Sequence, residues 1–226
     1  MGHHRDSLRL VGDDVAACRA CDRLVAWREQ VAREKRAAFR DQEYWGRGVP
    51  GFGDPAAGIL VMGLAPAAHG ANRTGRMFTG DRSGDWLYSA LFRAGLASQP
   101  QSVSREDGMT LHGVWITSPV KCAPPKNAPT PAERDRCRPF LQRELDLLLG
   151  VRVVLALGAF GFDQTARMLG APGRPKFAHG AEVRLTSGLT LLGCYHVSQQ
   201  NTFTGRLTEP MLDAVLARAV SLASPG

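Results

Sequence analysis

Short continuous apolar runs alternate with amphipathic segments along most of this chain. The apolar runs cover residues 58–64, 113–117, 151–157 and 189–195. A run that is apolar at nearly every position is typical of a strand buried on both faces of a parallel sheet, because a half-exposed strand would alternate apolar and polar residues. The four runs therefore predict four strands of one buried sheet.

The segments between and around these runs carry the apolar spacing of helices. They cover residues 15–39, 84–95, 130–149, 160–169 and 207–223. Thr130, Pro131 and Glu133 form a capping-box sequence with proline at the first helical position. Pro139 is expected to kink or interrupt the helix that begins there. Strands that alternate with helices predict an α/β fold whose parallel sheet is covered on both faces, in one domain.

The composition agrees with a globular chain and adds one clue about partners. Of its 226 residues, 44% are hydrophobic and 22% are charged, which excludes a disordered chain. The formal charge is +7, from 28 Lys and Arg against 21 Asp and Glu. A basic balance of this kind favours a polyanionic partner, most often nucleic acid. No apolar run has the length of a membrane span, and residues 1–10 lack the apolar stretch of a signal peptide, so we expect a cytoplasmic protein.

Four of the five cysteines form the clearest candidate for a metal centre. Cys18 and Cys21 make a Cys-x-x-Cys pair, and Cys122 and Cys137 lie far downstream. Disulfides are not expected in a chain without an export signal. Four thiolates have the ligand count of a structural zinc or an iron–sulfur centre, and the spacing does not separate the two. The alternative is an accidental pair and two isolated cysteines; Cys194, inside an apolar run, is expected to be a core residue.

Polar and glycine-rich loops follow the predicted strands. In a parallel α/β sheet the ligand lies beyond the carboxyl ends of the strands. These ends lead into residues 65–69, 118–127, 158–161 and 196–201. The segment 70–84 holds four glycines, which allow a backbone to approach a flat or anionic ligand closely. It matches neither the phosphate-binding loop of nucleotide hydrolases nor the dinucleotide fingerprint.

Four motifs in these loops together resemble the uracil-DNA glycosylase superfamily, and most of all its family 5, the type B iron–sulfur enzymes. They are 63–66 (GLAP), 75–84 (GRMFTGDRSG), 120–127 (VKCAPPKN) and 196–205 (HVSQQNTFTG). The resemblance implies a three-layer α/β/α sandwich around a four-stranded parallel twisted sheet. It implies one domain over residues 1–226, with an N-terminal helical segment that carries two of the cysteines. It also implies a structural 4Fe–4S cluster with Cys18, Cys21, Cys122 and Cys137 as ligands.

The activity that the resemblance implies is hydrolysis of the bond between a damaged base and deoxyribose, which starts base excision repair. The base reaches a pocket only after it leaves the duplex. Bond cleavage leaves negative charge on the departing base, so His196 at a strand end is the expected hydrogen-bond donor to it. Phe78 is expected to stack on the flipped base. Backbone amides around Gly63 and Leu64 are expected to hold the base carbonyls.

Two positions depart from related enzymes. Many relatives carry a water-activating Asp or Asn two residues after the motif glycine, where this chain has Ala65. As family resemblance suggests, Asp81 and Asn127 are the expected substitutes, to position water or to stabilise the sugar cation. Ser118 stands where other families carry a base-reading Asn. Without that side chain we expect a broad range of deaminated bases, with hypoxanthine and xanthine beside uracil.

The remaining expected contacts lie around the same loops. Residues 198–206 are expected to enter the minor groove and to support the gap that the flipped base leaves. Expected DNA contacts are Arg73, Arg76, Lys121, Lys126, Ser198, Gln199, Gln200 and Arg206. Further expected substrate contacts are Ala65, His69, Ser118 and Asn201. Several phosphate contacts acting together would make the affinity fall steeply with salt.

Other functions compete with this one. A non-catalytic iron–sulfur damage sensor would bind DNA without the missing water activator. A simple electron carrier would need neither the His196 loop nor the glycine-rich loop, and an enzyme of the type-4 kind would carry carboxylates in its first motif. The expected partner is double-stranded DNA, with single-stranded DNA as a second candidate. We expect a monomer that works at the nucleoid and has no membrane partner.

Overall fold

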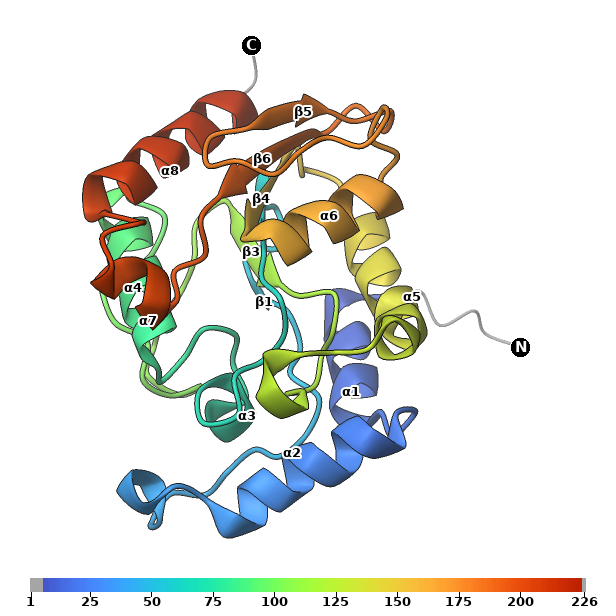
Figure 1. The fold of residues 1–226 in the computed structure, drawn as a ribbon, viewed down its shortest axis with the longest axis vertical. Coiled ribbons are helices and arrows are strands. Elements are labelled where there is room, and N and C mark those ends of the chain that lie inside the picture. The colour runs from blue at the N-terminus through green and yellow to red at the C-terminus, as the bar shows by residue number, and fades with distance from the viewer. Residues whose placement is uncertain (1–5, 225–226) are drawn as a thin grey trace.

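The computed structural model describes residues 6–224 and contains a sheet with the strand order β1-β3-β2-β4-β6-β5 (Figure 1). Its four central strands run parallel and are buried at every residue. They are β2 (Ile59–Met62), β3 (Val114–Thr117), β4 (Val153–Leu157) and β6 (Thr190–Cys194). The prediction of a parallel α/β sheet from the four apolar runs is confirmed.

Two short strands that the sequence pattern did not predict extend this sheet at its edges. β1 (Phe52–Gly53) pairs antiparallel with β3, and β5 (Glu182–Arg184) pairs antiparallel with β6. Strands of two and three residues are too short to show a polarity period. Short edge strands also leave few unpaired backbone groups for another chain to extend.

Helices cover both faces of the sheet. Successive strand residues point to opposite faces, so each central strand contributes side chains to two cores. Val61 of β2 belongs to the core under α4 (Arg82–Arg93) and α8 (Glu209–Ala223). Its neighbour Leu60 belongs to a second core, with α5 (Pro131–Leu147) and α6 (Ala159–Met168). This arrangement gives the three layers that the family resemblance implied (Figure 1).

Two helix predictions need correction. The predicted helix over residues 15–39 is two helices, α1 (Leu8–Ala17) and α2 (Asp22–Glu34), followed by a short 3-10 turn η1 (Ala37–Phe39). The break falls at the Cys-x-x-Cys pair, where Cys18 caps α1 and Cys21 precedes α2 in extended conformation. In contrast, α5 runs through Pro139 without interruption. An interior proline removes one backbone hydrogen bond, which tertiary contacts of the helix can offset.

Three short elements lie beyond the carboxyl ends of the parallel strands. They are α3 (Ala71–Thr74) after β2, η2 (Pro125–Asn127) after β3 and α7 (Gln199–Phe203) after β6. Each is too short to be predicted from periodicity, but together they surround one end of the sheet (Figure 1). Among residues 6–224, no helix combines the length and the apolar character that crossing a membrane requires.

Candidate active site

A cavity of about 310 Å³ lies at the carboxyl ends of the parallel strands. The loop after β2, the loop before α4, the loop after β3 and the loop after β6 all contribute to it. Its lining residues are Gly63, Leu64, Ala65, Pro66, Ala67, Met77, Phe78, Asp81, Ser83, Ser118, Asn127, His196 and Ser198. The structure therefore brings together all three predicted catalytic residues and five of the predicted substrate contacts. A volume of this size at this end of a sheet suits a small-molecule ligand.

The rings of Phe78 and His196 meet in this cavity. Their centroids lie 6.3 Å apart with an interplanar angle of 36°. Phe78 has a φ of 51°, which is uncommon for a residue with a bulky side chain. Gly63 makes room for the ring, because a Cβ at position 63 would lie 3.0 Å from its Cε2 and Cζ atoms. A backbone that holds an aromatic ring in this rare conformation is typical of a functional site.

His196 lies at the end of β6, where the chain turns into α7. Burial lowers the pKa of its imidazole, because the apolar surroundings disfavour the charged ring. The ring is therefore neutral at pH 7, with one N–H group to donate. Its backbone carbonyl accepts a hydrogen bond of 2.8 Å from Asn201 Nδ2. Asn201, expected to touch the substrate, thus anchors the His196 loop and does not line the cavity.

The two carboxylate oxygens of Asp81 have different surroundings. Its Oδ1 accepts a 3.0 Å hydrogen bond from the Gly84 backbone N–H and so caps α4. Its Oδ2 lies against Gly70, so that a Cβ at position 70 would be 2.0 Å from this oxygen. Burial raises the pKa of Asp81, and the hydrogen bonds from the backbone oppose that rise only in part. A carboxylate with a raised pKa is a stronger base toward a nearby water molecule.

Ser118 and Asn127 enter the cavity from the segment after β3. Ser118 is buried and donates a 2.8 Å hydrogen bond to the Val120 carbonyl, so its hydroxyl oxygen still has capacity to accept. Asn127 ends η2 with a φ of 54° and is exposed to solvent. An amide at an exposed edge of a pocket can contact a sugar, a water molecule or the rim of a base.

The predicted contacts at His69, Arg73 and Arg76 do not line the cavity either. His69 turns away from it, and its Nδ1 lies 3.1 Å from the Tyr44 hydroxyl. Arg76 is 4% exposed and forms a 2.6 Å ion pair with Asp107. Arg73 is 7% exposed and donates to the backbone carbonyls of His69 (2.8 Å) and Gly80 (2.6 Å). The two arginines therefore hold the glycine-rich loop in shape and are not available to phosphates in this conformation.

The predicted phosphate contact at Lys121 is also buried, since its Nζ lies 2.6 Å from Glu144. Lys126, by contrast, is exposed beside the cavity edge formed by η2.

Four lining residues were not predicted: Pro66, Ala67, Met77 and Ser83. All four are within or next to the motifs at 63–66 and 75–84, and this proximity was the signal that could have found them.

The surface beside the cavity carries exposed aromatic and cationic groups. Phe203 of α7 is 66% exposed, and the guanidinium of Arg82 lies 4.7 Å from the centroid of its ring. Arg206 lies 4.7 Å above the ring of Tyr195. Gln199 and Gln200 are on the same short helix as Phe203. Phe203 lies within residues 198–206, the segment expected to enter the minor groove, but the sequence analysis did not single out its side chain.

The four cysteines of the predicted metal centre line a second, smaller cavity. It lies between the break after α1, the start of α2 and the segment after β3, with α5 beside it. Within residues 6–224, no group of three or more His, Cys, Asp or Glu side chains has the arrangement of a ready metal site. Arg28 Nη1 lies 2.9 Å from Cys122 Sγ, and the Lys121 N–H donates to Cys137 Sγ over 3.2 Å.

Burial raises the pKa of the thiols of Cys21, Cys122 and Cys137, for Cys137 to about 12. Protonated, neutral thiols are what such surroundings favour when no cation is bound. Cys194 is buried in the core of the sheet, away from this cavity, as predicted.

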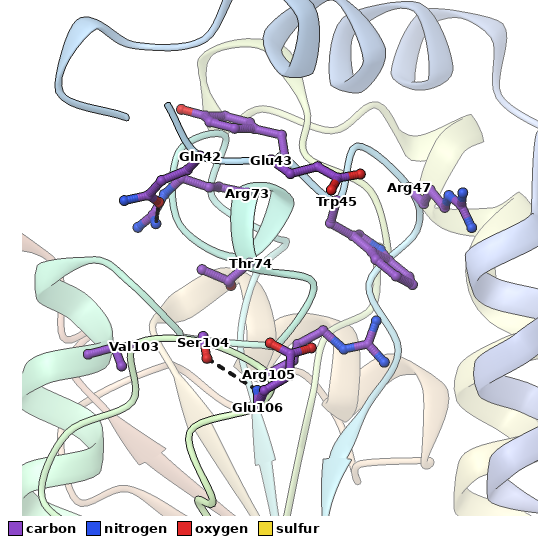
Figure 2. Close-up of a pocket in the computed structure, with 11 residues that line it drawn as sticks. Gln42, Glu43, Trp45, Arg47, Arg73, Thr74, Val103, Ser104, Arg105 and Glu106 are labelled. Atoms are coloured by element: carbon purple, nitrogen blue, oxygen red, sulfur yellow. Dashed lines mark hydrogen bonds between the residues drawn. The ribbon is translucent and has the colours of Figure 1, made fainter. Parts of the chain in front are cut away.

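A third cavity, of about 420 Å³, shares no lining residue with the one around Phe78. Figure 2 shows it between residues 42–47, α3 and residues 103–106. The guanidinium groups of Arg47 and Arg105 lie 5.4 Å and 4.4 Å from the Trp45 ring centroid. Glu43 and Glu106 line the same space, so it mixes both signs of charge. It holds none of the predicted catalytic residues.

The residues that line the Phe78 cavity lie within the part of the chain that matches a known protein family. Residues 50–219 match the family model described as "Uracil DNA glycosylase superfamily". A "Type-5 uracil-DNA glycosylase" of Mycobacterium tuberculosis is 57% identical over 212 residues, which cover 92% of this chain and 79% of that protein. Proteins of the same name from Thermus thermophilus and Pyrobaculum aerophilum are 53% and 48% identical over 210 and 204 residues. These matches cover 92% and 90% of this chain and 95% and 88% of those proteins.

Proposed function

Because the chain belongs to the uracil DNA glycosylase superfamily, and within it to the type-5 uracil-DNA glycosylases, we propose that it excises uracil from DNA by hydrolysing the N-glycosidic bond. Release of the base would leave an abasic site and start base excision repair. The observation that carries this proposal is the meeting of Phe78 and His196 in one cavity of about 310 Å³. One ring can stack on a base while the other donates a hydrogen bond to it.

Substrate binding begins with extrusion of the nucleotide from the duplex, since the glycosidic bond is not accessible inside the stack. The flipped base replaces its lost stacking partners with the ring of Phe78. Phe203, which is exposed, would occupy the gap in the duplex, as apolar wedges do in other proteins that distort DNA. Arg82, which lies against Phe203, and Arg206 would contact phosphates.

Cleavage of the bond moves its electron pair from C1′ to the departing base. The base oxygens then carry negative charge, which the neutral imidazole of His196 stabilises through its N–H. Positive charge develops on the sugar at the same time. The oxygen of a water molecule bonds to C1′, and the proton that this water loses neutralises the departing base anion by way of solvent.

Asp81 and Asn127 are the groups we propose for the sugar side of the reaction. Asp81 keeps Oδ1 on the cap of α4, so Oδ2 is the oxygen to orient water or to face the sugar cation. Asn127 lines the same cavity from the loop after β3. Ala65 supplies no polar group there, which is why both side chains are assigned to water.

We also propose that Cys18, Cys21, Cys122 and Cys137 bind a 4Fe–4S cluster. The cavity that they line supports this, as do the N–H groups that point at two of the sulfurs. When bound, the cluster would tie α1, α2, α5 and the loop before Asn127 together. Its role would be structural, since the cysteines line a different cavity from Phe78 and His196.

In this proposal, the small side chain of Ser118 gives the enzyme a broad range of substrate bases. A small hydroxyl that both donates and accepts discriminates less between base edges than an amide in a fixed orientation. Hypoxanthine and xanthine would therefore also be released from DNA. The alternative is a sensor that binds deaminated DNA and leaves the base in place.

The test is an alkali-cleavage assay on duplexes with one uracil, hypoxanthine or xanthine, and a thymine duplex as the control. We expect strand cleavage after alkali with uracil, with slower cleavage for the two purines, and none for thymine. Cleavage with uracil alone would overturn the broad specificity and leave the glycosylase intact. Tight binding of the uracil duplex with no cleavage would overturn the enzymatic function and favour the sensor.

A further inference from the structure

Arg28 is the largest polar side chain that the fold buries completely. It lies in the middle of α2 and is 1% exposed. Its Nη2 donates a 2.8 Å hydrogen bond to the Cys18 carbonyl, and its Nη1 lies 2.9 Å from Cys122 Sγ. Its Nε has no hydrogen-bond partner among the described residues. The guanidinium therefore contacts two of the proposed cluster ligands, through the Cys18 carbonyl and the Cys122 sulfur, while its Nε–H has no partner among the described residues.

Arg28, like Arg73, is a buried cation without a carboxylate partner, but Arg73 donates to oxygens of Gln42, His69 and Gly80, whereas Arg28 Nε has no hydrogen-bond partner among the described residues. Lys121 pairs with Glu144, and Arg76 pairs with Asp107. Glu29, the next residue along α2 from Arg28, is bound instead by Arg19. Within residues 6–224, no ion pair includes Arg28. A buried cation without a counter-charge is costly, so residues that carry one almost always have an anion nearby.

We propose that Arg28 is the counter-charge of the cluster held by the four cysteines, and that its hydrogen bond to Cys122 helps to retain that cluster. This inference rests on the proposed 4Fe–4S centre. Thiols that coordinate iron do so as thiolates, so the loaded site brings negative charge beside the guanidinium. Hydrogen bonds and charges next to cluster sulfurs are among the features that set a reduction potential.

The same residue also connects the cluster region to the active-site loop. The backbone carbonyl of Arg28 accepts a 3.2 Å hydrogen bond from Asn72 Nδ2, and Asn72 is fully buried in α3. Arg73, its neighbour, donates to the Gly80 carbonyl directly before Asp81. Arg28 is thus a positioning residue: its side chain faces the cysteines while its main chain supports α3.

The experiment compares the intact, cluster-loaded protein with Arg28→Met and Arg28→Lys. Arg33→Met is the control, because Arg33 is an exposed arginine of the same helix. Two readouts are measured: the midpoint reduction potential of the cluster, and the rate at which its visible absorption fades with an iron chelator. Loss of a nearby positive charge disfavours the reduced, more negative cluster, so Arg28→Met should shift the potential to more negative values.

Loss of a charged hydrogen bond should also speed fading about ten- to a hundredfold in Arg28→Met. Arg28→Lys, which keeps the charge, should stay near the wild-type potential, and Arg33→Met should match wild type in both readouts. An unchanged potential and fading rate in Arg28→Met would overturn the inference. If that variant does not fold, a wild-type potential in Arg28→Lys supports the inference, and a potential clearly different from that of wild type and Arg33→Met opposes it. Wild-type protein that contains no iron would instead refute the proposed cluster itself.

Discussion

Replacement of His196 by alanine is expected to lower the single-turnover rate of uracil excision by about 10²–10³-fold, the usual effect of removing one hydrogen-bond donor from a developing oxyanion. The imidazole is buried in the cavity at the end of β6, and burial lowers its pKa. A neutral ring donates without first losing a proton to solvent. Titration of His196 should therefore not change the rate of the wild-type enzyme between pH 7 and pH 8.

Exposed His112 provides the matched control for this variant. His112→Ala should retain the wild-type rate, and both variants should bind a uracil-containing duplex with nearly wild-type affinity. The measurement is the rate constant of base release with enzyme in excess over DNA. A His196→Ala rate within about threefold of wild type would contradict the role of this donor, since a factor of that size corresponds to well under 1 kcal/mol.

Replacement of Lys121 by methionine is expected to lower the free energy of unfolding by about 3–5 kcal/mol. Lys121 Nζ lies 2.6 Å from Glu144 Oε2, and both side chains are 2% exposed. The same carboxylate accepts hydrogen bonds from the Thr117 hydroxyl (2.7 Å) and the Gly51 N–H (3.2 Å). Without the lysine, a carboxylate stays buried with hydrogen bonds but no cation.

Urea denaturation of the purified variants measures this effect. Removal of both charges in the double variant with Glu144→Leu should restore part of the lost stability, because no uncompensated carboxylate is left. Arg138→Met is a suitable control, since Arg138 pairs with Asp135 on the exposed surface of α5. Equal destabilisation by Lys121→Met and Arg138→Met would show that burial of the pair has no energetic weight.

The sequence predicted the framework of the site well, for a physical reason. Continuous apolar runs such as 153–157 have few alternatives to a strand buried on both faces. Parallel strands then bring their carboxyl ends to one edge, so the loops that carry Phe78 and His196 had to converge. The position of each ring within the cavity follows from local features, such as the absence of a side chain at Gly63.

The arginines show where sequence reasoning failed. Arg73 and Arg76 lie in a glycine-rich loop, and their charge suggested phosphate contacts. In the fold, Arg76 instead meets Asp107, 31 residues further along the chain. Charge and position in the sequence do not show whether a side chain is buried, because burial depends on partners that only the tertiary fold brings near. Arg28 was overlooked for the same reason.

Short elements were the other weak point. α3 and α7 support the catalytic loops, yet helices of four and five residues have no amphipathic period to detect. The break between α1 and α2 was also missed, since apolar and charged residues continue on both sides of it. The Cys-x-x-Cys pair at that break was the available signal.

Phe78 and His196 are assigned to one flipped base in one cavity, and a double-mutant cycle on the single-turnover rate of uracil release measures this most directly. The cycle needs wild type, Phe78→Leu, His196→Ala and the double variant. If both groups act on the same base, the two losses in transition-state stabilisation should fail to add, with a coupling of about 0.5–3 kcal/mol. Losses that add to within about 0.5 kcal/mol would contradict a shared site for the two rings.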